Sequence, residues 1–294
     1  MRDAPIQLEL PTQIVASILI DVPEAGATLT HAASLLVRIA TDEFHPPSIT
    51  EFFPEILFSI GPLSVHRIHL VQFLATIVVV LIFWLGTRKL KLVPGRGQSI
   101  VEMGFDLVRV NIAHDMMGKK DGDRFLPLLT TIFFMVLFMN MTGVIPFLNI
   151  AGTSIIAVPL LLAVIAYGAF IYAGVRKGVW HFIRNSLFPP GVPPALYILV
   201  APLEFISTFI VRPVTLTLRL LMNMMVGHLM LVLFFAATQF FIFSMGGFWT
   251  VLGAGTLAFG FAFTAFEILV AFLQAYVFTI LTAVYIQLAV ADEH

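Results

Sequence analysis

The second half of the chain is almost free of charge. From Asn185 to Ala291 only four side chains carry a formal charge: Glu204, Arg212, Arg219 and Glu267. Charged residues make up 11% of the whole chain and hydrophobic residues 59%, whereas soluble domains contain about 25% charged residues. Several apolar runs exceed the ~18 residues that indicate a membrane span. They lack the alternating pattern of a transmembrane barrel, so each span must satisfy its backbone hydrogen bonds as a helix. We therefore predict an all-α integral membrane protein.

The apolar runs divide the chain into about five membrane-embedded helices and one amphipathic surface helix. We predict spans over about 70–87, 125–146, 155–175, 195–238 and 248–290, and the surface helix over about 98–117. Together they form a membrane-embedded domain over residues 67–294. Residues 1–66 are rich in proline and are predicted to form an extracytoplasmic N-terminal region, with a weakly amphipathic helix near Ala32–Ala40. Its start, MRDAPIQLEL, matches neither a signal peptide nor a transit peptide.

Basic clusters set the predicted orientation. They follow the first span at Arg88-Lys89, precede the second in GKKDGDR (118–124), and follow the third at Arg176-Lys177. Lysine and arginine accumulate in cytoplasmic loops, so these ends are expected in the cytoplasm. The N-terminus is then outside and the C-terminus cytoplasmic, and Gly152 and Thr153 fall in a short outer loop.

The last two apolar segments are too long for simple spans. At 1.5 Å per residue, the segment over 195–238 would reach about 65 Å, twice the ~30 Å hydrocarbon thickness. Each segment is either a hairpin or one long, steeply tilted helix. We prefer the tilted helix, because no polar turn lies near the middle of either segment. A helix inclined in this way needs a large partner surface inside the membrane.

Arg219 lies far inside the first of these segments. An arginine at the bilayer centre costs about 2.5–3.5 kcal/mol on insertion scales and is a functional candidate. The alternative is a side chain that reaches the interface from a helix end, which does not suit Arg219, because apolar residues extend far on both sides. For Arg212, both interpretations stay open.

Helical geometry groups the polar side chains of both segments. At 100° per residue, Asn223 lies about 40° from Arg219, whereas His228 lies about 180° away. On the last segment Glu267 and Gln274 are seven residues apart and share a face, which Tyr285 also joins. Asn223 and Gln274 suit either an ion pathway or ordinary interhelical hydrogen bonding. A titratable group in hydrocarbon, such as Glu267, favours a functional role.

Two motifs carry a resemblance to a known family. The stretch RPVTLTLRLLMNMMVGHLML (212–231), followed by FEILVAFLQAYVFTILTAVYIQLA (266–289), resembles subunit a of the F-type ATP synthase. Weaker matches are PGRGQSIVE (94–102) and FMNMTGVIP (138–146), and the similarity extends from about Phe44 to the C-terminus. The resemblance implies a stationary, non-catalytic proton-channel subunit that lies against a rotating ring of c subunits and is joined by peripheral-stalk b subunits.

The resemblance also implies roles for individual residues. Arg219 matches the arginine that separates two offset half-channels, and Asn223 matches its companion. Gln274 matches the glutamine opposite the arginine, and His228 and Glu267 match a coupled pair of positions. Asn140 matches an asparagine of the inlet half-channel, and Gly143 stands where some members carry an acid three residues after that asparagine. Glu204 matches an acid of the exit half-channel.

The position of Glu204 departs from the family pattern. Its spacing to Pro213 is one residue longer than usual. A bulge in the helix between them would absorb the extra residue. Without such a bulge, the role of Glu204 is in doubt.

Two other function classes fit the sequence less well. A secondary ion transporter with an intramembrane charged site is the alternative function, but such proteins show internal repeats and paired broken helices, which this sequence lacks. An intramembrane hydrolase would need a motif such as HExxH or GxSxG, and neither occurs. We expect no cofactor, no metal and no nucleic-acid partner. We expect a bacterial plasma membrane rather than a mitochondrial one, and protons as the transported ion.

Overall fold

The computed structural model describes residues 56–60, 63–88, 95–145, 148, 150–187, 196–245 and 247–290. Most of the predicted N-terminal region, including the helix expected near Ala32–Ala40, lies outside these residues. The chain divides into two compact units: residues 235–257 belong to the smaller one, and residues 47–234 and 258–294 to the larger. Within these residues, five helices are long and apolar enough to cross a membrane. The prediction of an all-α integral membrane protein is thereby confirmed.

A short hairpin precedes the first helix and was not predicted. Strand β1 (Ile56–Ile60) pairs antiparallel with β2 (Leu63–His66), and Ser59 lies opposite Ser64. Helix α3 (Arg67–Thr87) follows directly and covers the first predicted span.

The predicted surface helix and second span form one helical run that bends. It consists of α4 (Arg96–Val108), the π-helix η2 (Arg109–His114) and α5 (Asp115–Met141). Gly118 interrupts the run with φ 73° and ψ 170°, a conformation that glycine adopts without steric cost. The interruption falls in the charged segment GKKDGDR, where the sequence predicts a turn.

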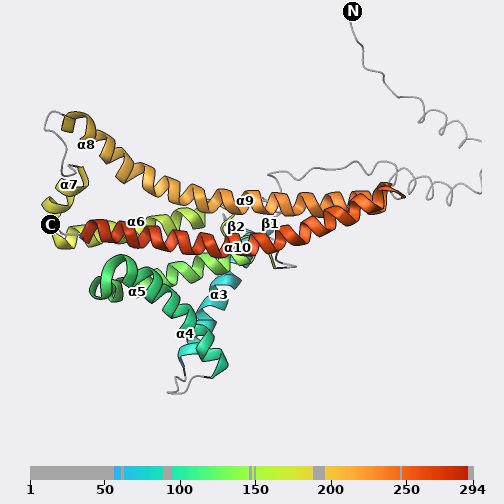
Figure 1. Ribbon diagram of the computed structural model, residues 1–294, viewed down its shortest axis with the longest axis horizontal. Coiled ribbons are helices and arrows are strands. Elements are labelled where there is room, and N and C mark those ends of the chain that lie inside the picture. Colours follow the sequence, from blue (N-terminus) through green and yellow to red (C-terminus); the bar gives the residue numbers. More distant parts are fainter. Residues whose placement is uncertain are drawn as a thin grey trace, which may run out of the picture. The chain divides into compact units, whose positions relative to one another are not determined.

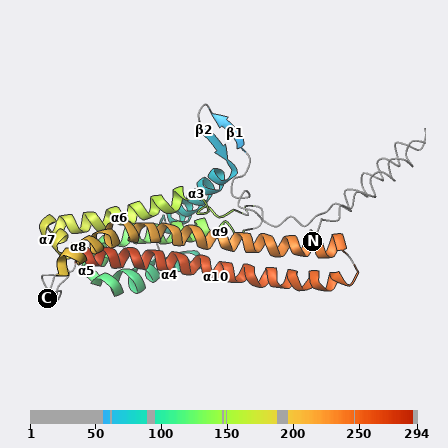
Figure 2. The same cartoon turned by 90° about the horizontal axis from the view of Figure 1, so that it is seen from above.

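The remaining helices of the larger unit share one buried hydrophobic core with α5. Helix α6 (Ala157–Lys177) is followed by the short α7 (Val179–Leu187), and α8 (Tyr197–Ile206) continues through the π-helix η4 (Ser207–Val211) into α9 (Arg212–Gln239). Figures 1 and 2 show α9 beside α10 (Trp249–Val290) where both belong to this unit. The rings of Phe133 and Phe272 join α5 to α10, and those of Tyr167 and Phe209 join α6 to η4.

Both long segments are continuous helices, so the hairpin alternative is wrong. Helix α10 has 42 residues, about twice the ~20 residues of a perpendicular span. The run from α8 ends in the π-helix η5 (Phe240–Met245). In the smaller unit a turn follows at Gly247, which has φ 60°, and the hydroxyls of Thr238 and Thr256 are 2.8 Å apart.

Candidate functional site

Arg219 lies on an exposed face of α9. Its neighbours on this face, Leu218 and Met222, are also exposed. Across the described ranges, no carboxylate and no hydrogen-bond acceptor pairs with the Arg219 guanidinium. The face therefore presents an unneutralised positive charge within an apolar surface.

Asn223 and Gln274 connect α9 to α10 one turn from Arg219. The Asn223 side chain donates its Nδ2–H to Gln274 Oε1 at 2.8 Å. Gln274 is 4% exposed, and its own Nε2 has no partner among the described residues. The contact is an interhelical hydrogen bond, one of the two interpretations that the sequence left open.

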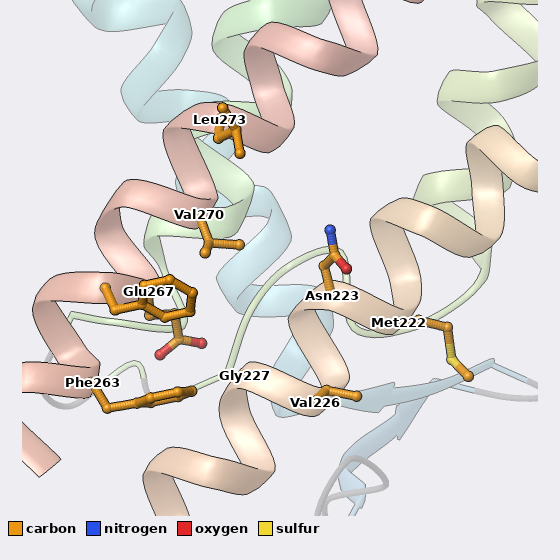
Figure 3. A pocket seen from close by; sticks show the side chains of 9 residues that line it. Met222, Asn223, Val226, Gly227, Phe263, Glu267, Val270 and Leu273 are labelled. Carbon is orange, nitrogen blue, oxygen red and sulfur yellow. The ribbon is translucent and has the colours of Figure 1, made fainter. Parts of the chain in front are cut away.

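Glu267 reaches from α10 to the backbone of α9. A Cβ placed on Gly227 would lie 2.7 Å from Glu267 Oε1, so only glycine leaves room for this carboxyl group. Glu267 is 3% exposed. Figure 3 shows its carboxyl group between the two helices, beside Gly227.

A cavity lies between α9 and α10 next to this carboxyl group. Its volume is about 380 Å³, enough for several water molecules at ~30 Å³ each. It is lined by apolar side chains and by two polar ones, Asn223 and Glu267 (Figure 3). The cavity thus joins the neighbourhood of the Asn223–Gln274 contact to the buried carboxyl group.

His228 lies on the other side of α9 from Arg219. It is 5% exposed, whereas Arg219 is exposed, which agrees with the half-turn between them expected from helical periodicity. Because His228 follows Gly227 directly, its backbone lies beside the Glu267 contact.

Asn140 belongs to a separate buried polar cluster. It is fully buried on α5, and its Oδ1 accepts a hydrogen bond from the Thr153 hydroxyl at 2.6 Å. The Thr142 hydroxyl donates to the carbonyl oxygen of Ile150 and accepts from the amide of Gly152. Gln72 of α3 donates to the Gly152 carbonyl oxygen at 2.8 Å. The segment with Gly152 and Thr153 is therefore a buried loop, held by hydrogen bonds to α3 and α5.

Sequence reasoning missed three members of this cluster. Gln72, Thr142 and Thr153 are ordinary residues of apolar segments, and no spacing rule connects them to Asn140. Only Asn140 itself pointed to such a cluster in the sequence, because an amide inside hydrocarbon needs hydrogen-bonding partners.

Glu204 precedes the bulge that its spacing requires. It is half-buried on α8, and the π-helix η4 begins three residues later. A π-bulge inserts one residue into a helix, which compensates for the extra residue between Glu204 and Pro213. Arg212, at the end of the bulge, lies over the ring of Tyr285 with 5.5 Å between the guanidinium carbon and the ring centroid.

Among the described residues, no three histidine, aspartate or glutamate side chains lie close enough to hold a metal ion. The polar groups gathered at α9 and α10 are instead one fixed cation, two amides and a buried acid. The amides and the acid can hold water within the membrane, and of these groups the acid can exchange a proton.

Comparison with known proteins decides the family. The family model for the ATP synthase A chain matches residues 69–287. ATP synthase subunit a of Rhodococcus erythropolis is 49% identical over 262 residues, which cover 88% of this chain and 95% of that relative. This chain belongs to the ATP synthase subunit a family.

Two further members of the family match at lower identity. Subunit a of Frankia alni is 37% identical over 267 residues, which cover 88% of this chain and 91% of that relative. Subunit a of Streptomyces lividans is 38% identical over 232 residues, covering 76% and 79% of the two chains. The family match includes α9 and most of α10, and so contains the whole candidate site. As a subunit a with five apolar helices, the chain is a multi-pass membrane protein.

Proposed function

We propose that this chain is the stationary proton-channel subunit of an ATP synthase and is not itself catalytic. Its partners are a rotating ring of c subunits, which lies against the exposed face of α9, and peripheral-stalk b subunits. The chain lies in a bacterial plasma membrane, with its N-terminus outside and its C-terminus in the cytoplasm. Two offset half-channels carry protons to and from carboxyl groups of the ring, and Arg219 separates them.

The observation that carries this proposal is the exposed, unpaired charge of Arg219 on an apolar helix face. Placing a bare guanidinium against lipid is costly, so a partner with an acidic group must cover this face. A unit-charge pair at 4 Å contributes about 4 kcal/mol at an effective dielectric near 20, which corresponds to about three pKa units. A ring carboxyl group that reaches Arg219 therefore releases its proton, and in lipid it becomes neutral again.

Arginine suits a barrier between two proton paths. Its guanidinium cannot be deprotonated in a protein, so it does not pass protons on. Moving one charge across the membrane yields about 2.3 kcal/mol per 100 mV, and a barrier that leaked protons would waste this energy. Asn223, bonded to Gln274, lies one turn further along α9 and holds the helices together beside the barrier.

The buried polar groups belong to the two paths. Glu267 and His228, with the cavity between α9 and α10, supply the proton-exchanging part of the inlet, and the Asn140 cluster lines the same path. Buried polar atoms of Glu267, Gln274 and Asn140 have no partner among the described protein groups, as expected where water enters. Glu204, before the bulge, lies on the exit path.

The test is ATP-driven proton pumping by the assembled complex in vesicles. Arg219→Ala and Arg219→Lys are expected to abolish pumping while the complex still assembles, because neither combines a fixed charge with the planar fork of arginine. Arg96→Lys, at an exposed position on α4, is the control and should pump normally. Full pumping by either Arg219 variant would refute the proposal.

A further inference from the structure

Two arginines converge on one tyrosine where α5 and α6 meet. Arg176, near the end of α6, donates from Nη1 to the Tyr172 hydroxyl at 3.0 Å. Arg124 of α5 interacts with the same hydroxyl group by hydrogen bonding and by its charge. Tyr172 is 55% exposed, and both arginines are exposed as well. The three side chains thus form a small basic surface spanning two helices.

No acid neutralises this surface within the described part of the chain. The ion pairs there join Asp123 to Arg109 and to His114, so the nearest carboxylate along the chain from Arg124 is already engaged. Arg124 also lies over the ring of its neighbour Phe125, which holds its stem against α5. Two guanidinium groups around one oxygen repel each other, and an anion between them would convert that repulsion into attraction.

An apolar stripe runs along α6 from the arginine pair. Leu161, Ile165, Tyr172 and Arg176 follow each other at helical spacing on one exposed face. Gly168 completes this face, and a Cβ placed there would meet no atom within 4 Å. The stripe therefore has an open position one turn from Tyr172, where an alkyl chain has room to lie.

We propose that Arg124, Arg176 and Tyr172 bind the phosphate of an anionic phospholipid whose acyl chain lies along the α6 stripe. A guanidinium group recognises phosphate oxygens through parallel N–H donors, and the Tyr172 hydroxyl adds a further donor. Basic sites between transmembrane helices at the membrane surface are suited to anionic head groups. This site requires that the chain spans a membrane, but it does not depend on the proton-channel role.

The position of the site favours a lipid over free phosphate and over a protein partner. Arg176 is the penultimate residue of α6, at the end of an apolar helix, where lipid phosphates lie. Free phosphate would need only the charges and not the apolar stripe. An acidic side chain of another subunit would neutralise the arginines equally well, but it would leave the open position at Gly168 unused.

The experiment uses the assembled complex, extracted with lipids and then reconstituted in nanodiscs of phosphatidylcholine with added phosphatidylglycerol. Retained phospholipid is counted by native mass spectrometry. The double variant Arg124→Gln, Arg176→Gln is expected to bind phosphatidylglycerol about thirtyfold more weakly, since each arginine near an anionic surface contributes about a fivefold preference. The control Arg96→Gln, Arg184→Gln removes the same charge from other exposed positions and should change this affinity less than threefold.

Two further experiments distinguish the phosphate of a lipid from free phosphate. Gly168→Leu fills the open position and should weaken binding of long-chain phosphatidylglycerol, while a dihexanoyl analogue binds as before. Inorganic phosphate at millimolar concentration should not displace the bound lipid. Equal affinity of the double variant and the control would overturn the proposal, as would displacement by phosphate alone or an acidic side chain of another subunit between the arginines. Normal ATP-driven pumping by the double variant would show that these outcomes do not bear on the proton channel.

Discussion

Replacing Gly227 with alanine should displace the Glu267 carboxyl group without unfolding the protein. The added Cβ would lie 2.7 Å from Glu267 Oε1 and 3.3 Å from Glu267 Cδ, so the carboxyl group must retreat from α9. The conflicting atom is the far end of a flexible side chain, and moving it to a less favourable rotamer costs about 0.5–1.5 kcal/mol. Alanine is favoured over glycine inside a helix by about 1 kcal/mol, so the net change in stability is close to zero.

The functional effect should be larger than the effect on stability. Because the Cβ contact must open from 2.7 Å to an ordinary 3.4–4 Å, the carboxyl group moves by about 0.7–1.3 Å. A misplacement of about 1 Å costs up to ~100-fold in rate where groups must be aligned, and we expect about a tenfold loss of passive proton conductance. The assay is proton flux through the membrane sector in vesicles, together with the amount of assembled complex.

The matched control is Gly168→Ala, because a Cβ at Gly168 meets no atom within 4 Å. This variant should conduct protons as the unmodified protein does. Conductance of Gly227→Ala within twofold of the unmodified protein would refute the reasoning, since the position of the carboxyl group against α9 would then not matter. An equal loss of proton conductance in both variants would mean that replacing a helical glycine, and not the displacement of Glu267, lowers the conductance.

Three further predictions concern the same helices. Glu267→Gln keeps the shape but removes the titratable group, so proton uptake should slow more than release, measured as passive conductance under gradients of opposite sign; equal slowing in both directions would contradict the inlet role. A double-mutant cycle of Asn223→Ala and Gln274→Ala should give a coupling energy of about 0.6 kcal/mol, as for other hydrogen bonds between membrane helices, measured by unfolding in detergent; a coupling of zero would mean that the 2.8 Å contact is not stabilising. Glu204→Gln should reduce ATP-driven pumping several-fold if the bulge directs Glu204 to the exit path, whereas unchanged pumping would exclude that role.

Much of the fold follows from charge and length alone. Apolar runs without charges and basic clusters at their ends predict the five apolar helices. Helical periodicity also separates exposed Arg219 from buried His228 and brings Asn223 to the face that meets Gln274. These features are local, because 100° per residue determines which side chains share a face.

The features that the sequence did not predict depend on contacts across the fold. Asn140 bonds to Thr153, which lies thirteen positions further along the chain, and no periodicity relates the two. The strand pair of Ile56–Ile60 and Leu63–His66 was not predicted, because the prolines of this segment indicated only that no long helix forms there. The role of Gly227 could not be predicted either, because the contact between a helical glycine and a side chain of another helix depends on how the two helices pack.

Glu267 of α10 contacts α9 well away from Arg219. This separation explains how one chain can hold both a buried acid and an unpaired arginine. The acid contacts α9 at Gly227, eight residues from Arg219, which is about 12 Å along the helix axis. At that distance and an effective dielectric near 20, the two charges attract by about 1.4 kcal/mol, compared with about 4 kcal/mol in contact. An acid one turn from Arg219 would form an internal ion pair, and a rotating carboxyl group would then have to break that pair at every step. The two-turn separation keeps the guanidinium available to a partner while the acid stays beside the cavity, so shifting the acid to Val270 (Glu267→Val, Val270→Glu), one turn closer to the level of Arg219, should lower the rate of pumping.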